Sequence, residues 1–116
     1  MPNPVTHFEV LGNDAAGLQR FYGEAFGWQM QDVMDGGYYM VDTGVEGAVA
    51  GGVGSGQGGP GHVTFYVEVA DPAAALAKIS ELGGKTVQEP MDVPGGPTIA
   101  LFADPEGHVV GLVKST

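Results

Sequence analysis

Apolar and polar positions along the first half of the chain predict a strand, a helix and three further strands. Residues 5–11 carry β-branched and aromatic side chains in imperfect alternation, which is typical of a strand. The next apolar positions have helical spacing and form one stripe: Leu18, Phe21, Tyr22 and Ala25. Asp14 stands where a helix N-cap is expected, and Gly27 stands where a helix commonly ends. Three strand-like runs follow, at residues 29–34, 38–43 and 48–53.

The second half of the chain repeats this pattern. A strand is predicted at residues 62–69, and Asp71 followed by Pro72 predicts the start of a helix. The apolar positions of that helix are Ala73, Leu76, Ile79 and Leu82, and the glycine pair at 83–84 predicts its end. Three strands are again predicted, at residues 85–89, 98–103 and 108–114. The helix-starting aspartates, Asp14 and Asp71, lie 57 positions apart (71 − 14), so each half is predicted to be a βαβββ module.

Glycine-rich segments separate the predicted elements. The longest of them, residues 54–61, lies near the middle of the chain and is predicted to be a connector without packed structure of its own. The chain is therefore expected to be one domain made of two modules, at about residues 4–53 and 62–114. A module of fewer than about 60 residues buries too little surface to be stable alone. We therefore expect sheet to meet sheet, either within one chain or between the two chains of a homodimer.

Composition and charge narrow the range of functions. The chain has 14 acidic and 4 basic side chains, a net charge of −10, and its basic residues form no stripe. Nucleic acid and anionic membranes are therefore not expected as partners. The absence of cysteine excludes disulfides, iron–sulfur clusters, thiolate zinc sites and a cysteine nucleophile. The first residues lack the features of a signal peptide, and no apolar run approaches the roughly 18 residues of a spanning helix, so we expect a cytoplasmic protein.

Several stretches together resemble the vicinal-oxygen-chelate superfamily, which includes glyoxalase I, bleomycin-resistance proteins, fosfomycin-resistance enzymes and extradiol dioxygenases. The stretches are His7-Phe8-Glu9-Val10, Phe21-Tyr22, Phe26-Gly27-Trp28, Leu82-Gly83-Gly84 and Asp104-Pro105-Glu106-Gly107-His108. The resemblance extends over nearly the whole chain. It implies an α+β fold in which two tandem βαβββ modules form a cupped mixed sheet, with the helices outside and the ligand inside.

The resemblance also indicates where a metal would be held. Metal-using members of the superfamily bind one divalent ion (Fe, Ni, Mn or Zn) between side chains of the first and last strands of each module. His7 matches the first of these positions, and the separation of 57 gives Thr64 as its counterpart. The last-strand positions fall on Gly111 and, 60 positions earlier, on Gly51. Because glycine has no side-chain donor and threonine is a poor ligand for these ions, no metal is favoured. If one is bound, we expect His7 and His62 to hold it, which requires a bulge or a register change in the second of these strands.

Strand alternation predicts which residues face the ligand. If Phe8, Val10, Phe65 and Val67 pack against the helices, the opposite positions point into the cup. The predicted lining is His7, Glu9, Gly51, His62, Thr64, Tyr66, Glu68 and Gly111. Such a lining, in a chain of net charge −10, favours a neutral or cationic organic ligand. A slip of one residue in register would reverse the assignment.

Three functions are compatible with this sequence. The favoured one is a metal-free homodimer that binds a small molecule in the cup, as drug-sequestering members of the superfamily do. The alternative is a metal-dependent lyase, isomerase or dioxygenase whose site is rebuilt around His7, His62 and a carboxylate such as Glu9 or Glu68. The third is a metal-free enzyme in which His7 acts as a general base, with Tyr66 or Glu9 as its orienting partner. The sequence does not decide whether the protein is an enzyme.

Overall fold

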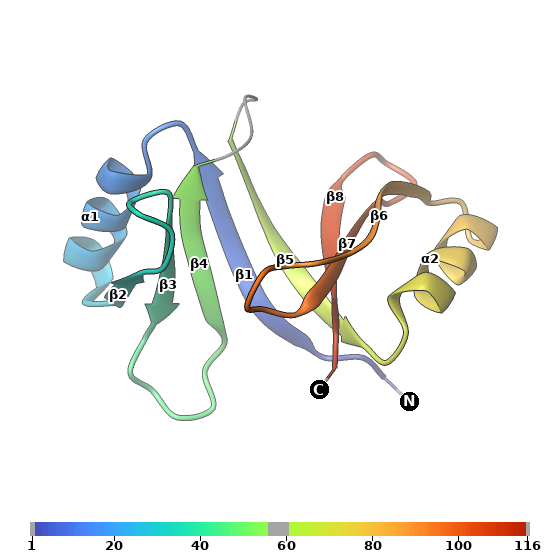
Figure 1. Cartoon of the computed structure of the whole chain (residues 1–116), viewed down its shortest axis with the longest axis horizontal. Helices are drawn as coiled ribbons and strands as arrows, with labels where there is room; N and C mark the ends of the chain where they lie inside the picture. Colours follow the sequence, from blue (N-terminus) through green and yellow to red (C-terminus); the bar gives the residue numbers. More distant parts are fainter. Residues whose placement is uncertain (1, 56–60, 116) are drawn as a thin grey trace. The chain divides into compact units, whose positions relative to one another are not determined.

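A computed structural model describes residues 2–55 and 61–115, which contain eight strands and two helices (Figure 1). The elements, in chain order, are β1 (Val5–Gly12), α1 (Ala15–Phe26), β2 (Gln29–Asp32), β3 (Tyr38–Asp42), β4 (Ala50–Ser55), β5 (His62–Val69), α2 (Pro72–Glu81), β6 (Lys85–Asp92), β7 (Thr98–Ala103) and β8 (Val109–Lys114). Each predicted element is present in the predicted order, with small differences at the ends. The α+β class with two βαβββ repeats is therefore confirmed. Residues 56–60, the middle of the predicted connector, lie outside the described residues.

The chain divides into two compact units whose boundaries fall inside two strands. Unit 1 consists of Met1–Thr6 and Phe65–Thr116, and unit 2 consists of His7–Thr64. The start of β1 thus belongs with the strands of the second half, where the Glu68 N–H donates to the Pro4 carbonyl at 2.9 Å. The modules at residues 4–53 and 62–114, which divide the chain at the connector, stay a prediction.

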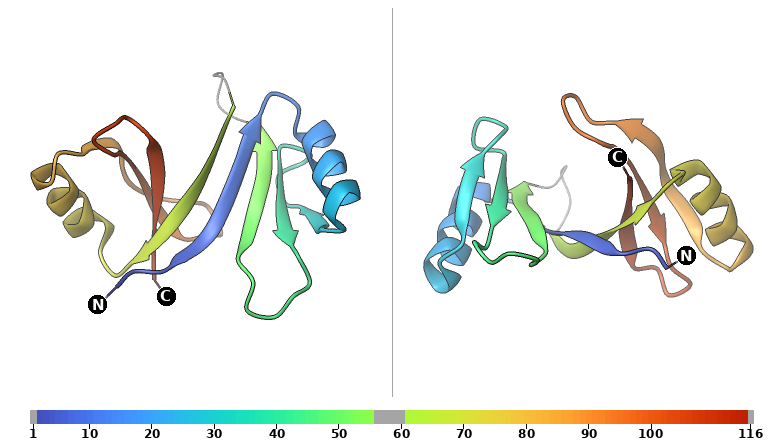
Figure 2. Two further views of the ribbon diagram at one scale, coloured as in Figure 1. Left: turned by 180° about the vertical axis from the view of Figure 1, so that it is seen from behind. Right: turned by 90° about the horizontal axis from the view of Figure 1, so that it is seen from below.

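In unit 2, four strands lie in the order β2-β3-β4-β1 (Figure 2). The pairs β2/β3 and β3/β4 are antiparallel, and β4 pairs in parallel with β1. Helix α1 lies along one side of these strands, where the buried valines Val10, Val41 and Val53 pack with Leu18 and Tyr22 of the helix. We call the other side of the strands, away from α1, the helix-free face of unit 2.

Unit 1 repeats this arrangement with the order β5-β8-β7-β6. The strand β5 pairs in parallel with β8, and the pairs β8/β7 and β7/β6 are antiparallel. Helix α2 contributes Leu76 to a core that contains Val69, Ala100 and Leu112. The repeated topology means that residues of β1 and β4 correspond to residues of β5 and β8.

Both helices begin and end as the sequence predicts. The Asp14 carboxylate accepts the Gly17 N–H at 2.9 Å, and the Asp71 carboxylate accepts the N–H groups of Ala73 at 3.0 Å and Ala74 at 3.3 Å. These bonds satisfy N–H groups that have no partner within the first helical turn. Helix α1 ends at Gly27, which has a left-handed backbone (φ 73°) that glycine adopts without strain. Neither helix of the described chain is long and apolar enough to cross a membrane.

The apolar stripe predicted for α1 is only partly buried. Leu18 and Tyr22 pack against the core, as expected, but Phe21 is 63% exposed and Ala25 is also exposed. Successive residues of a helix are rotated by about 100°, and the buried side of α1 is centred between Leu18, Tyr22 and Ala15. Phe21 therefore lies on one flank of the helix, and helical spacing alone was too coarse to separate that flank from the buried side.

Candidate functional site

The register between β1 and β4 determines which side chains reach the helix-free face of unit 2. Phe8 is paired with Gly51, and its ring packs on Trp28 in the core beneath α1, with ring centroids 5.4 Å apart. Because side chains alternate along a strand, His7 and Glu9 point to the opposite side. His7 is half-buried there, and Glu9 is 9% exposed. The sequence placed both residues on this face, and their position agrees.

A tyrosine from β3 joins these two side chains. The Tyr38 hydroxyl donates to Glu9 Oε2 at 2.9 Å and lies 3.1 Å from His7 Nε2. A carboxylate can only accept, so the hydroxyl proton is committed to Glu9 and His7 Nε2 donates to the tyrosine oxygen. The result is a chain of hydrogen bonds from imidazole through phenol to carboxylate, which we call the His7–Tyr38–Glu9 network.

Burial determines the charge of the histidine in this network. Removal from water lowers the pKa of His7 below its usual value of 6.5, and the nearby Glu9 charge opposes that shift only in part. His7 is therefore neutral at pH 7. A neutral imidazole that donates through Nε2 has its acceptor at Nδ1, and the phenol and carboxylate oxygens also accept, so the network consists mainly of hydrogen-bond acceptors.

Gly52, rather than Gly51, is the glycine of this face. Gly52 is paired with Glu9, and a Cβ atom on Gly52 would overlap the Tyr38 hydroxyl and lie 2.6 Å from Tyr38 Cε2. The aromatic ring thus lies over the place where a side chain at position 52 would project. A Cβ atom on Gly51 would instead lie 2.5 Å from Phe8 Cζ, on the side of the helix. Gly51 therefore lies on the helix side and not on the face of His7 and Glu9 where it was expected, a difference of one residue that on a strand reverses the face.

Unit 1 contains the same combination of tyrosine and glycine. Tyr66 on β5 is paired with Gly111 on β8, and a Cβ atom on Gly111 would lie 2.7 Å from Tyr66 Cγ. Tyr66 is 8% exposed, and both residues lie on the side of their strands away from the core under α2. The predicted positions of Tyr66 and Gly111 on the same face agree with this register. Gly111 follows Gly52 by 59 positions (111 − 52), so these two glycines are the equivalent residues of β4 and β8.

Two of the remaining predicted residues lie at the start of β5. Thr64 is 7% exposed, whereas His62 is exposed. Glu68, the last residue of the predicted lining, lies further along β5, is paired with Val113 and is half-buried. Among residues 2–55 and 61–115, no three His, Asp or Glu side chains gather closely enough to hold a metal ion. A site that combines His7 and His62 with a carboxylate is therefore not assembled in the described part of the chain.

Comparison with known proteins identifies the family. A family model described as Glyoxalase/Bleomycin resistance protein/Dioxygenase superfamily matches residues 5–112. The chain belongs to this superfamily. Solved structures share the fold: methylmalonyl-CoA epimerase from Mycobacterium tuberculosis has a TM-score of 0.71 at 13% identity, covering 97% of this chain and 87% of the other. The hypothetical protein BH1468 from Bacillus halodurans C-125 has a TM-score of 0.73 at 13% identity, covering 100% and 96%.

A relative of higher sequence identity is an anthracycline biosynthesis protein, DnrV, from Streptomyces peucetius. It is 32% identical over 123 residues, which cover 91% of this chain and 45% of the relative. The chain therefore spans less than half the length of this relative.

The donor set of this superfamily member does not fit a divalent ion held by the first and last strands. The first-strand positions are His7 and Thr64, and the last-strand positions are Gly52 and Gly111 once the register is corrected. Only His7 is a good ligand, because threonine binds these ions poorly and glycine offers no side-chain donor. The space above each glycine is taken by a tyrosine ring.

Tyr38 is a residue of the network that the sequence pattern does not predict. It lies in a predicted strand, but its face depends on the β3/β4 register, in which Tyr38 is paired with Gly54. A signal was nevertheless present, because three of the five residues at 50–54 are glycine. Glycines at alternate positions of a strand often mark the close approach of a bulky neighbour.

Proposed function

We propose that this protein binds a small organic ligand without a metal ion, at the His7–Tyr38–Glu9 network on the helix-free face of unit 2. One observation carries the proposal: Tyr38 lies over Gly52 with its hydroxyl between His7 and Glu9. A phenol thus takes the space that a metal-binding side chain of β4 would need. The position is held by hydrogen bonds on both sides, so the ring has a defined orientation toward a ligand.

The chemistry of the network supports a neutral or cationic ligand. The Glu9 carboxylate and the Tyr38 oxygen accept hydrogen bonds, and the tyrosine ring can stack on a planar group or face a cation. The chain carries a net charge of −10, which attracts cations and repels phosphates and carboxylates. Since a relative at 32% identity is named for anthracycline biosynthesis, an anthracycline belongs among the compounds to be tested.

The proposal includes a homodimer in which each chain binds ligand. Each unit has one helix and four strands, a small structure whose second sheet face is not covered by its own helix. Sedimentation equilibrium at micromolar concentration is expected to give twice the mass of the chain. A monomer would reject this part of the proposal and leave ligand binding to be judged separately.

Metal content tests the proposal directly. Protein purified without a metal-affinity tag, then dialysed against buffer containing Fe, Ni, Mn or Zn, is expected to retain far less than one ion per chain by elemental analysis. One tightly held ion per chain that is lost in the His7→Ala variant would overturn the proposal. That result would favour the metal-dependent lyase, isomerase or dioxygenase.

Ligand binding is tested with a matched pair of variants. A thermal-shift screen compares cationic aromatic compounds, including an anthracycline, with catechols and with α-oxoaldehyde adducts, and calorimetry then measures the affinity of the compounds that stabilise the protein. Tyr38→Phe removes the hydroxyl of the network and is expected to weaken binding about tenfold, the effect of one lost hydrogen bond of about 1.4 kcal/mol. Tyr39→Phe removes the hydroxyl of the next residue, which points to the other face of β3, and should bind as the original protein does. Stabilisation only by the last two compound classes would argue for an enzyme.

A further inference from the structure

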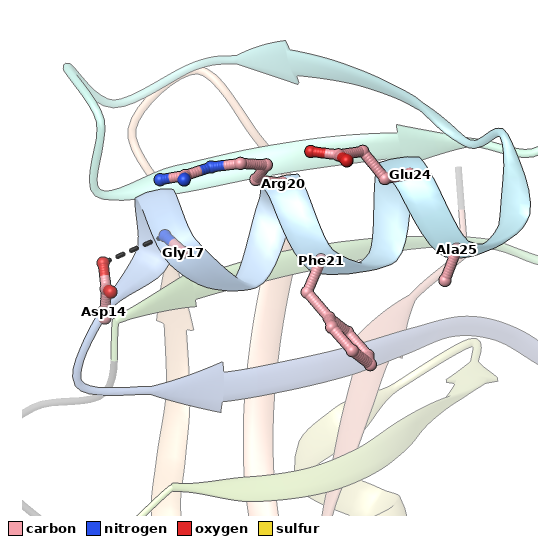
Figure 3. A pocket seen from close by; sticks show the side chains of 6 residues that line it. All are labelled: Asp14, Gly17, Arg20, Phe21, Glu24 and Ala25. Atoms are coloured by element: carbon pink, nitrogen blue, oxygen red, sulfur yellow. Dashed lines mark hydrogen bonds between the residues drawn. The ribbon is translucent and has the colours of Figure 1, made fainter.

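The outer side of α1 carries a groove that the proposed ligand site does not use. The groove has a volume of about 610 Å³ and is lined by Asp14, Gly17, Arg20, Phe21, Glu24 and Ala25 (Figure 3). All six belong to α1 or its N-cap, and all except Gly17 are exposed. Phe21 is 63% exposed, and Phe26 on the same helix is 62% exposed. We call this surface the α1 groove.

The residues of the α1 groove are arranged so that the surface complements itself. Gly17, Phe21 and Ala25 are four residues apart, so a small residue lies about 6 Å from the phenylalanine on either side along the helix axis. If two copies of α1 cross antiparallel at Phe21, the Gly17 of each copy faces the Ala25 of the other. Small residues at those places let the helices approach to about 8–10 Å, with the two phenylalanine rings meeting at the centre.

Charge supplies a second and independent complementarity. Arg20 and Glu24 lie together along one flank of α1, while Phe21 and Ala25 project on the other flank (Figure 3). Arg20 forms no ion pair with another side chain in the described part of the chain. In an antiparallel pair of helices, residues of the same flank meet, so Arg20 of each copy comes opposite Glu24 of the other. Because of the two-fold symmetry, this contact between Arg20 and Glu24 occurs twice in the dimer.

We propose that the α1 groove is where a second copy of this chain docks, with the two α1 helices antiparallel about a two-fold axis close to Phe21. The inference rests on the homodimer in the proposed function and adds its surface, and it is independent of the ligand. Two chains of net charge −10 repel each other over most of their surfaces. Arg20 is the one lysine or arginine among His7–Thr64, and in the α1 groove it lies with two acidic residues, Asp14 and Glu24, so the proposed contact pairs it with Glu24 of the second copy.

Charge-reversal variants test this proposal, and each variant serves as a control for the other. Arg20→Glu alone and Glu24→Arg alone each put like charges opposite one another twice and are expected to raise the dimer dissociation constant about tenfold or more in sedimentation equilibrium. An equimolar mixture of the two variants pairs opposite charges at both contacts, so it should form a heterodimer as tight as the original homodimer. The double variant Arg20→Glu/Glu24→Arg should also dimerise normally.

Matched controls carry the same charge changes on α2. Lys78→Glu and Glu81→Arg alter the net charge equally but lie outside the α1 groove, and they should leave the dissociation constant within about twofold. Phe21→Ser should make the chain monomeric while its far-UV circular dichroism stays unchanged, because the ring is exposed.

Three other outcomes would contradict the proposal, each at a different step of the argument for the interface. A monomer for the original chain rejects the dimer altogether, including that part of the proposed function. A dimer that the α1 variants do not weaken rejects the surface and leaves the homodimer intact. Failure of the mixed variants to associate rejects the antiparallel contact between Arg20 and Glu24.

Discussion

Gly51 and Gly52 are neighbours on β4 whose missing side chains belong to opposite faces, and they provide the sharpest test of the site. Adding one methyl group at position 51 pushes toward the core under α1. The same methyl group at position 52 pushes toward the His7–Tyr38–Glu9 network. The two substitutions to alanine are chemically identical, so any difference between their effects on stability or binding comes from the surroundings of positions 51 and 52.

The Gly51→Ala substitution should lower stability and leave ligand binding unchanged. The added Cβ atom would lie 2.5 Å from Phe8 Cζ, and the Phe8 ring is confined by Trp28 and the buried core. Overpacking of this kind costs about 1–3 kcal/mol, and the lower backbone entropy of alanine in the unfolded chain returns about 0.5–1 kcal/mol. A net loss of about 1–2 kcal/mol corresponds to a fall of about 4–8 °C in Tm for a domain of this size.

The Gly52→Ala substitution should act mainly on ligand binding. Its Cβ atom would overlap the Tyr38 hydroxyl, at the far end of a side chain that can rotate away from the strand. The rotation breaks both hydrogen bonds of the phenol, each worth about 1 kcal/mol, while the backbone entropy again returns about 0.5–1 kcal/mol. Stability should therefore fall by about 1–1.5 kcal/mol, and affinity for a stabilising ligand should fall at least about tenfold.

Urea unfolding and calorimetry on the same preparations separate these effects. If Gly51→Ala weakens the ligand more than Gly52→Ala does, the assignment of faces is wrong and the proposed site fails with it. As a control, Tyr38→Ala combined with Gly52→Ala removes the ring that the methyl group strikes. Its affinity should equal that of Tyr38→Ala alone, because the clash no longer exists.

Three further predictions concern pH, the second glycine and a helix cap. Because burial holds the pKa of His7 below 6.5, this residue is protonated in the unfolded chain before it is protonated in the folded chain as pH falls. The free energy of unfolding should therefore decrease below about pH 6.5. Urea titrations between pH 5 and 8 should show a flatter dependence on pH for the His7→Gln variant. An unchanged slope in His7→Gln would show that other groups dominate. Gly111→Ala should lower Tm more than Gly52→Ala in a thermal melt, because the added Cβ atom would overlap Cδ2 and Cε2 of the Tyr66 ring and lie 2.7 Å from its Cγ, in a side chain that is 8% exposed. Equal melting temperatures would contradict this prediction. Asp71→Ala removes both N-cap bonds of α2 and should cost about 1 kcal/mol in urea unfolding, whereas Asp71→Asn should retain most of the stability.

The helices and strands could be predicted because the residues that begin and end them interact with neighbours close in the sequence. Asp14 and Asp71 accept the first N–H groups of their helices, and Gly27 adopts the left-handed backbone that ends α1. These interactions join residues only a few positions apart, so spacing along the chain is enough to find them. The repeat of the pattern after 57 positions then suggested two modules, and the family followed from the order of the motifs.

The site could be predicted only in part because it depends on register between strands. His7 and Glu9 are on one strand, so alternation alone placed them on the same face. Gly51 was chosen by measuring from a turn, 60 positions before Gly111, whereas the strands themselves repeat after 59. Tyr38 comes from a third strand, and its approach to His7 depends on a pairing that no local pattern specifies.

The ring that lies over Gly52 also constrains how this protein could evolve. A carboxylate at position 52 would collide with Tyr38, and loss of Tyr38 alone would leave Glu9 and His7 without the hydroxyl that joins them. Each change is unfavourable until the other has occurred, so selection acting on single substitutions would oppose the acquisition of a metal-binding strand residue. Two coupled mutations therefore separate the present donor set from one with a metal-binding side chain at position 52.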